Sequence, residues 1–68
     1  MSKGYSLGRS FVMAQTDRFL KIRVRDLNRV IQVPKRVVHD DSEVWELGHE
    51  GNLIVFRWWA EDEELVVD

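Results

Sequence analysis

The most regular pattern in the chain is an alternation of apolar and basic residues between Arg18 and Arg25. Three apolar residues alternate there with three cations, in the order Leu20, Lys21, Ile22, Arg23, Val24 and Arg25. A period of two is typical of a β-strand that has one face in the core and the other in solvent. The pattern therefore predicts a half-buried strand whose outer face carries the cations.

The segments around this strand predict two further strands. Ser10–Gln15 is apolar enough to form a strand before it, whereas Met1–Gly8, with its glycines and serines, is expected to be a loose terminus. Asp26–Arg29 has the composition of a turn, because Asp and Asn side chains bond to nearby backbone groups. Val30–Val33 is then expected to return antiparallel and to stop at Pro34, which has no N–H for the ladder.

The second half of the chain is organised around His39–Leu65, which holds all three tryptophans and both histidines. Two β-rich runs, Glu43–Leu47 and Asn52–Trp58, are joined by the glycine-containing loop Gly48–Gly51, and this arrangement is typical of a hairpin. The second run is apolar without alternation at 53–56, which favours a central strand covered on both faces.

Short segments flank this hairpin. Lys35–Val38 predicts a turn with 3₁₀ character. Trp58–Leu65 predicts a short C-terminal helix, because Trp58, Asp62 and Leu65 have the spacing of residues on one helical face. The acids Glu61–Glu64 would then lie in an early turn, where they favour the helix dipole.

These elements predict a mainly β fold in a single domain that spans residues 1–68. We expect a small, strongly bent antiparallel sheet or an SH3-like barrel of about five strands with a short C-terminal helix, because bending or closure removes exposed strand edges. A chain of this length buries only ~60% of the surface that its unfolded form exposes, so its core must be simple.

The chain contains no cysteine. Neither a disulfide nor a thiolate metal site can therefore add stability, and the composition suits a reducing cytosol. The N-terminal segment holds no signal-like apolar run, and no apolar run in the chain approaches the ~20 residues that cross a bilayer. We expect a cytoplasmic protein with no membrane partner.

The net charge of −2 conceals two oppositely charged halves. Residues 1–38 hold nine Lys and Arg against two Asp, whereas residues 39–68 hold ten acids against one Arg. Two explanations stay open. The halves pair across neighbouring strands and keep the domain soluble, or they form two faces with different partners. Docking of one half onto the opposite half of a second copy would make a homo-oligomer.

The residues from Val33 to Glu61 carry a family resemblance. They follow the pattern V-P-K-R-V-V-H-D-D-S-E-V-W-E-x-G-x-E-G-x-L-x-V-x-x-W-W-A-E. This pattern resembles a group of short, mostly uncharacterised proteins encoded by phages and other mobile elements, and the resemblance implies a phage-type origin without an activity to carry over. Phe56 stands where that group usually has Pro, and Glu64 replaces the Gly before Leu65. The entry to and exit from the final segment are therefore expected to differ here.

Side chains with metal-binding chemistry occur in the loops. Five residues are ligand types for a divalent metal, namely His39, Asp40, Asp41, His49 and Glu50. Their spacing matches no recognised metal motif, and Asx and Ser turns use the same residue types to satisfy backbone donors. We therefore favour turns at these positions and expect no metal and no cofactor.

A catalytic set is not evident in the sequence. Ser10 or Ser42 could pair with a histidine as nucleophile and base, but a nucleophile elbow and a third orienting group are missing from the pattern. Gly48–Gly51 lacks the Lys-Ser/Thr pair that a phosphate loop needs, and it carries a carboxylate instead. The sequence therefore predicts a protein that is not an enzyme.

Tryptophan dominates the large apolar residues of the second half. A chain this short needs at least one tryptophan in its core, and Trp45 or Trp58 is the expected one. Trp58 and Trp59 cannot both face inward, since neighbours on a strand point to opposite faces and neighbours on a helix lie ~100° apart. One of the pair is therefore expected to be partly exposed, where it would pack on the last residues or anchor an interface.

The first of two functional hypotheses is a non-enzymatic protein-interaction module. In the phage setting that the resemblance implies, it would inhibit or modulate a host protein or nucleoprotein complex in the host cytoplasm, as an anti-defence protein of the anti-CRISPR type does. An acidic surface would compete there for a basic groove. The predicted partner-binding residues are the anchor Trp59 and the acids Glu61, Asp62, Glu63 and Glu64.

The second hypothesis is a small β-barrel that binds nucleic acid through a basic face. Alternate cations along a strand stand ~6.5–7 Å apart, close to the spacing of backbone phosphates. Against this hypothesis, Phe19 is the only aromatic residue well placed among the cations, and the pI near 5.6 is unlike that of a typical phosphate binder. The residues concerned are Lys21, Arg23, Arg25, Arg29, Lys35 and Arg36.

Overall fold

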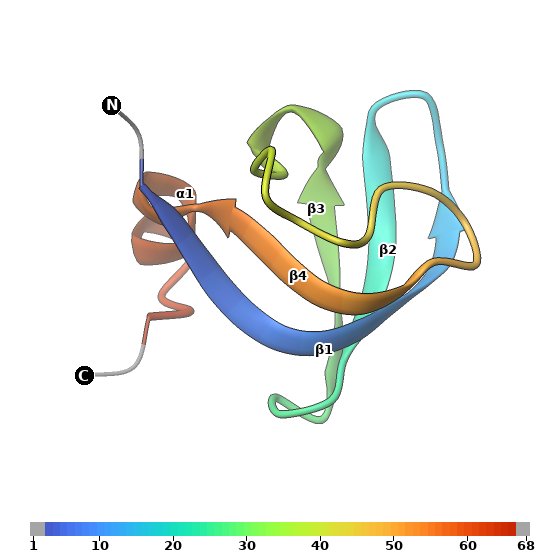
Figure 1. Cartoon of the computed structure of the whole chain (residues 1–68), viewed down its shortest axis with the longest axis horizontal. Helices are drawn as coiled ribbons and strands as arrows, with labels where there is room; N and C mark the ends of the chain where they lie inside the picture. Colours follow the sequence, from blue (N-terminus) through green and yellow to red (C-terminus); the bar gives the residue numbers. More distant parts are fainter. Residues whose placement is uncertain (1–2, 67–68) are drawn as a thin grey trace.

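Four antiparallel strands form one open sheet, and a short helix follows the last strand (Figure 1). The structure, a computed structural model, describes residues 3–66. The strands lie in the order β3-β2-β1-β4, so β3 and β4 occupy the two ends of the sheet. In chain order, the elements are β1 (Gly4–Gln15), β2 (Phe19–Val24), β3 (Arg29–Pro34), η1 (Lys35–Val37), β4 (Glu50–Phe56) and α1 (Arg57–Asp62).

Strand β1 is the longest strand, and Figure 1 shows that it bends strongly. Its first part pairs with β4 and its last part with β2, and each ladder contains an irregularity. The irregularity between residues 6 and 8 ends at Gly8, whose φ of +87° favours glycine. Leu7 faces the core before Gly8 and Val12 faces it afterwards, so the buried positions change from odd to even numbers. The bulge therefore keeps apolar residues on the core side while the strand passes from one partner to the other.

The core lies on the inner face of this sheet. Leu20, Ile22 and Val24 of β2 are fully buried, whereas Lys21 and Arg23 between them are exposed, so the predicted register of this strand is confirmed. The other buried apolar residues come from the remaining elements and from the segment between η1 and β4, namely Leu7, Val12, Val33, Val37, Val38, Val44, Leu53, Val55, Trp59, Ala60 and Leu65.

The expected turn, the return strand and the 3₁₀ segment are also confirmed. Residues 25–28 form the turn, in which Asn28 has a φ of +50° and its N–H donates to the Arg25 carbonyl. β3 then pairs with β2 as far as Pro34, and η1 follows directly. The expectation of a loose terminus up to Gly8 is wrong for the part that is described, because β1 begins at Gly4. Residues 1 and 2 lie outside the described residues.

The predicted hairpin of Glu43–Leu47 with the following run is not formed. β4 pairs with β1 instead, and residues 43–47 contain no strand. Much of this segment is satisfied locally, since the N–H groups of Trp45 and Glu46 donate to His49 Nδ1 at 3.1 and 3.3 Å. A side chain that accepts two successive N–H groups competes with a ladder for those donors.

β4 is not the central strand either, because it lies at one end of the sheet order. Its burial alternates, with Leu53 and Val55 buried and Ile54 half-buried. The chain after η1 covers its outer edge without forming a strand. Val38 makes an isolated bridge with Val55, and the His39 N–H donates to the Ile54 carbonyl. The outer edge of β4 is therefore partly occupied by this segment.

The predicted C-terminal helix is confirmed, but α1 begins at Arg57 and ends at Asp62. Glu61 and Asp62 therefore lie in its last turn and not in an early one, and carboxylates at that end oppose the helix dipole. The mainly β fold with a bent antiparallel sheet is confirmed, with four strands in an open sheet where about five strands or a closed barrel were expected. No helix in the described part of the chain is long and apolar enough to span a membrane.

Candidate functional site at the free edge of the sheet

The three tryptophans are placed differently from expectation. Trp59 is the buried one, with 8% of its surface exposed, whereas Trp45 and Trp58 are 39% and 54% exposed. Trp59 and Ala60 form the inner face of α1, and Trp58 points away from it because successive helical residues differ by ~100°. The expectation that Trp45 or Trp58 fills the core is therefore wrong. One of Trp58 and Trp59 is exposed as expected, but it is Trp58, and the role of Trp59 as an interface anchor stays a prediction.

The four predicted acids are all exposed, but they differ in their neighbours. Glu61 lies on the exposed side of α1, where its Oε1 is 3.8 Å from the Nε of Arg57. Asp62 and Glu64 are also exposed, and their contact with a partner stays a prediction. Glu63 lines the same groove as Trp59, so the fold brings these two predicted residues together.

The predicted basic residues belong to three places. Lys21, Arg23 and Arg25 follow the outer face of the sheet along β2. Arg29, at the start of β3, lines the groove that also contains Trp59. The remaining two cations belong to η1. Phe19 lines both the hollow that contains Lys21 and the one that contains Lys35 and Arg36, so these three cations lie around the same ring.

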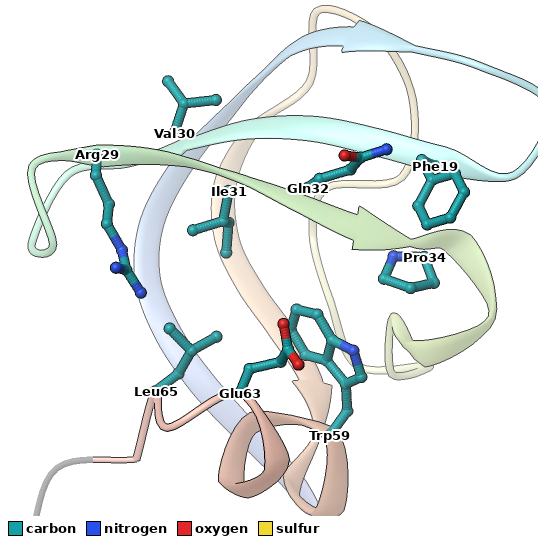
Figure 2. Close-up of a pocket in the computed structure, with 9 residues that line it drawn as sticks. All are labelled: Phe19, Arg29, Val30, Ile31, Gln32, Pro34, Trp59, Glu63 and Leu65. Atoms are coloured by element: carbon teal, nitrogen blue, oxygen red, sulfur yellow. The ribbon is translucent and has the colours of Figure 1, made fainter.

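A groove of about 590 Å³ lies between β3 and the C-terminal segment. Figure 2 shows Ile31 pointing from β3 toward the opposite wall, which Trp59 and Leu65 provide. Phe19 and Pro34 lie at one end of the groove. The helix α1 packs chiefly on β4 and β1, which leaves the side of β3 open. The groove therefore runs beside a strand at the end of the sheet, and both apolar and polar side chains line it.

The N–H and C=O groups of every second residue of β3 point away from β2, at the free edge of the sheet. The Lys35 N–H donates to the Arg18 carbonyl at 2.8 Å, and this bond fixes the phase of the β2–β3 ladder. Bonded and non-bonded pairs alternate along an antiparallel ladder. The N–H and C=O of Ile31 therefore face β2, whereas those of Val30 and Gln32 face away from it. Within residues 3–66 no hydrogen bond occupies these outward groups.

Two charged side chains accompany the groove. Arg29 extends from the start of β3, and Glu63 extends from the residue that follows α1 (Figure 2). In the described part of the chain neither of them forms an ion pair. Both charges are therefore free to contact charged groups of a bound molecule.

The residues considered for metal binding or catalysis have structural roles. His39 Nδ1 accepts the Asp41 N–H at 3.1 Å, and its ring packs edge-on against Phe56. The hydroxyls of Ser10 and Ser42 donate to nearby backbone carbonyls at 3.0 and 3.2 Å. No group of three or more His, Asp or Glu side chains that could hold a metal occurs within residues 3–66. These contacts fit the turn interpretation of the two loops.

The groove was not predicted from the sequence. Its walls come from residues 29–34 and 59–65, and only the fold brings these segments together. One signal was present, because a proline that ends a strand is typical of a sheet edge, and Pro34 could have marked β3 as the open one. Comparisons of the chain with protein-family models, with curated proteins and with solved structures give no match.

Proposed function

We propose that the protein is a non-enzymatic protein-interaction module that binds an extended segment of a partner protein along the outer edge of β3. The observation that carries this proposal is an unpaired strand edge beside a groove that Ile31, Trp59 and Leu65 help to line. An incoming strand would extend the sheet and direct alternate side chains into the groove. In such recognition, main-chain hydrogen bonds give affinity and side-chain pockets give specificity.

The edge offers enough interactions for a short segment. Val30 and Gln32 each present an N–H and a carbonyl, whereas the carbonyl of Pro34 is at the N-cap of η1. Each backbone hydrogen bond contributes ~0.5–1.5 kcal/mol net. Burial of one leucine-sized side chain against Trp59 and Leu65 adds about 1.5–3 kcal/mol. Ordering of the segment offsets part of this gain, so we expect weak binding, with dissociation constants of about 0.1–1 mM.

The residues of the groove favour a particular kind of segment. Ile31, Trp59 and Leu65 favour a large apolar side chain at the centre. Arg29 favours an acidic group near the start of β3, and Glu63 favours a basic group on the helix side. The expected ligand is therefore an extended segment with one apolar residue flanked by charges of opposite sign.

The biological role that we propose is inhibition or modulation of a host protein complex in the host cytoplasm. The resemblance to short proteins of phages and mobile elements supports this role. The exposed carboxylates Glu61, Asp62 and Glu64 support a partner with a basic surface, because exposed charges mainly raise the association rate. In an anti-defence protein, the exposed carboxylates would speed association with the partner, and the strand edge would slow its dissociation.

A displayed library of random peptides, followed by NMR of the ¹⁵N-labelled protein, tests the binding site. Enriched peptides should shift the backbone amide signals of Val30 and Gln32 and the indole signal of Trp59. In the free protein, the amides of Val30 and Gln32 should exchange with deuterium faster than that of Ile31, whose N–H lies in the ladder.

The variant Val30→Pro removes an outward donor without removing a ladder bond, and sheet edges tolerate proline. It should weaken peptide binding by about tenfold, the equivalent of one hydrogen bond of ~1.4 kcal/mol. The matched variant Val30→Thr keeps the N–H and the branched side chain and should bind as the wild type does. Thermal unfolding verifies that both variants fold. Equal peptide affinity of the two variants, or peptide-induced shifts confined to other surfaces, would refute the edge site.

A further inference from the structure

The outer face of the sheet, opposite the core, exposes several large apolar residues. Phe11, Phe19 and Val30 are 42%, 36% and 40% exposed there. In a small antiparallel sheet with one face on the core, the other face usually carries polar residues. Exposed aromatic rings on that face therefore indicate a surface that binds something.

Cations alternate with these apolar residues. The register places Phe11 directly opposite Arg23, and Arg23 directly opposite Val30, so these three residues form one row across β1, β2 and β3. Lys21 lies between Arg23 and Phe19 on the same face of β2. Aromatic and basic side chains are thus within reach of the same ligand.

Two shallow hollows follow β2 across this face. One, of about 180 Å³, is lined by Phe11, Arg23 and Arg25. The other, of about 300 Å³, is lined by Phe19 and Lys21. Phe11 of β1 pairs with Arg23 of β2, and Arg23 is four residues from Phe19 on β2. At ~3.3 Å per residue, the rings of Phe11 and Phe19 are therefore about 13 Å apart along the strand direction. Each ring is accompanied by its own cation.

This face is positive although the chain has a net negative charge. The hollow near Phe11 also contains Arg9, whose guanidinium lies 3.4 Å from Glu50. Among the described residues that line the two hollows, Glu50 is the only carboxylate. The acids near the C-terminus lie in the last turn of α1 or directly after it, and α1 packs into the core on the inner side of the sheet. Few carboxylates therefore lie where they would repel an anionic ligand from the outer face.

We propose that the outer face of the sheet binds single-stranded nucleic acid, with bases stacked on Phe11 and Phe19 and phosphates paired with Lys21, Arg23 and Arg25. Stacking on protein rings requires bases with a free face, which single strands offer and a duplex does not. Basic side chains that follow the backbone and rings that accept any base are the two components of such binding. An acidic peptide would use the cations but has no planar group for each of the two rings. The site shares Phe19 with the end of the edge groove but uses none of the outward backbone groups of β3.

Fluorescence anisotropy with a labelled oligothymidylate strand and a labelled oligouridylate strand measures this binding, with a duplex of equal length for comparison. Both single strands should bind at low salt, and the duplex should bind more weakly. The logarithm of the affinity should fall with the logarithm of the salt concentration with a slope of about −2, since each of three phosphate contacts contributes ~0.7.

Two double variants separate a local site from an effect of net charge. Lys21→Ala with Arg23→Ala should lower the affinity by about tenfold or more and reduce the magnitude of the salt slope by ~1.4. Lys3→Ala with Arg57→Ala removes the same charge near the first residues of β1 and α1, away from the two hollows, and should leave the affinity within about twofold. All four side chains are exposed, so both proteins should fold.

The aromatic contribution is tested by Phe11→Leu and Phe19→Leu, which keep the apolar surface but remove the ring. Each should lower the affinity on the order of tenfold, the effect of one lost stacking contact, and leave the salt slope unchanged. Circular dichroism verifies the fold of each variant. Glu63→Gln, which alters the edge groove alone, should not change nucleic-acid binding, so the two sites are tested separately.

Several results would overturn this inference. One is absence of binding to both single strands at low salt. Another is an equal loss of affinity in the two double-alanine variants, which would show a response to net charge alone. The third is duplex affinity equal to single-strand affinity, or unchanged affinity in both leucine variants, which would show that bases are not stacked.

Discussion

Trp58 and Trp59 are adjacent on α1 but lie in opposite environments, and their replacement by alanine tests the packing of the helix on the sheet. Trp59 is 8% exposed and belongs to the same core cluster as Ala60 and Leu65, whereas Trp58 is 54% exposed. Removal of the Trp59 ring would leave a cavity between α1 and β3, at a cost of about 3–5 kcal/mol. Trp58→Ala creates no such cavity and should cost about 0.5–1 kcal/mol.

The difference is large compared with the stability of so small a domain. At ~0.05–0.15 kcal/mol per residue, a chain of 68 residues has a free energy of unfolding of about 3–10 kcal/mol. Trp59→Ala should therefore be marginally folded or unfolded at room temperature, while Trp58→Ala should unfold cooperatively near the wild-type midpoint. Trp59→Phe, which retains part of the apolar volume, should recover a part of the loss.

Urea denaturation followed by circular dichroism measures the three free energies of unfolding. Fluorescence provides a second signal, because each variant keeps two tryptophans. Coincidence of the two signals shows whether unfolding is two-state. Equal stability of Trp58→Ala and Trp59→Ala, or a larger loss for Trp58→Ala, would contradict the orientation of α1.

Two further predictions concern the core and the loop beside β4. Ile22→Ala should cost on the order of 2–5 kcal/mol because Ile22 is fully buried, whereas Arg23→Ala should cost little, and equal melting temperatures would show that the register of β2 is wrong. Ser42→Ala should cost about 1–3 kcal/mol, because the buried Ser42 Oγ accepts the N–H groups of Val44 and Ile54 at 3.3 and 3.2 Å, and an unchanged denaturation midpoint would contradict this role.

The parts of the fold that the sequence predicted correctly are those that local pattern determines. The alternation around Ile22 depends on neighbours along one strand, and the turn at Asn28 depends on side-chain chemistry within four residues. The start of β1 at Gly4 could not be predicted from alternation. The bulge at Gly8 shifts the core-facing positions and so breaks the alternation that would have extended the predicted strand back to Gly4.

The failed hairpin shows where local pattern is insufficient. Leu53 and Val55 predict a strand correctly, but which strand pairs with it depends on β1, more than forty positions earlier in the chain. The tryptophans show the same limit. Whether Trp58 or Trp59 faces the core depends on where the helix begins, and the start at Arg57 turns Trp59 inward. The candidate groove could not be predicted for the same reason, since its two walls are distant in sequence.

The edge of β3 is suited to selective binding because its ends limit how far a new strand can pair. A long, flat and apolar edge invites uncontrolled pairing between chains, and charges or proline on the edge suppress it. Arg29 stands at one end of β3, and Pro34, which has no donor, stands at the other. Between them only Val30 and Gln32 present both an N–H and a carbonyl outward. A partner segment must therefore align its own groups with this short stretch.

The wall opposite β3 adds a second condition. An incoming strand must place a side chain that fits against Trp59 and Leu65, and Trp59 is held in position by its own packing in the core. A second copy of β3 would bring Arg29 and Pro34 with it and offers only the half-buried Ile31 for that wall. The edge is therefore better matched to an extended segment of a different protein than to a second copy of this chain.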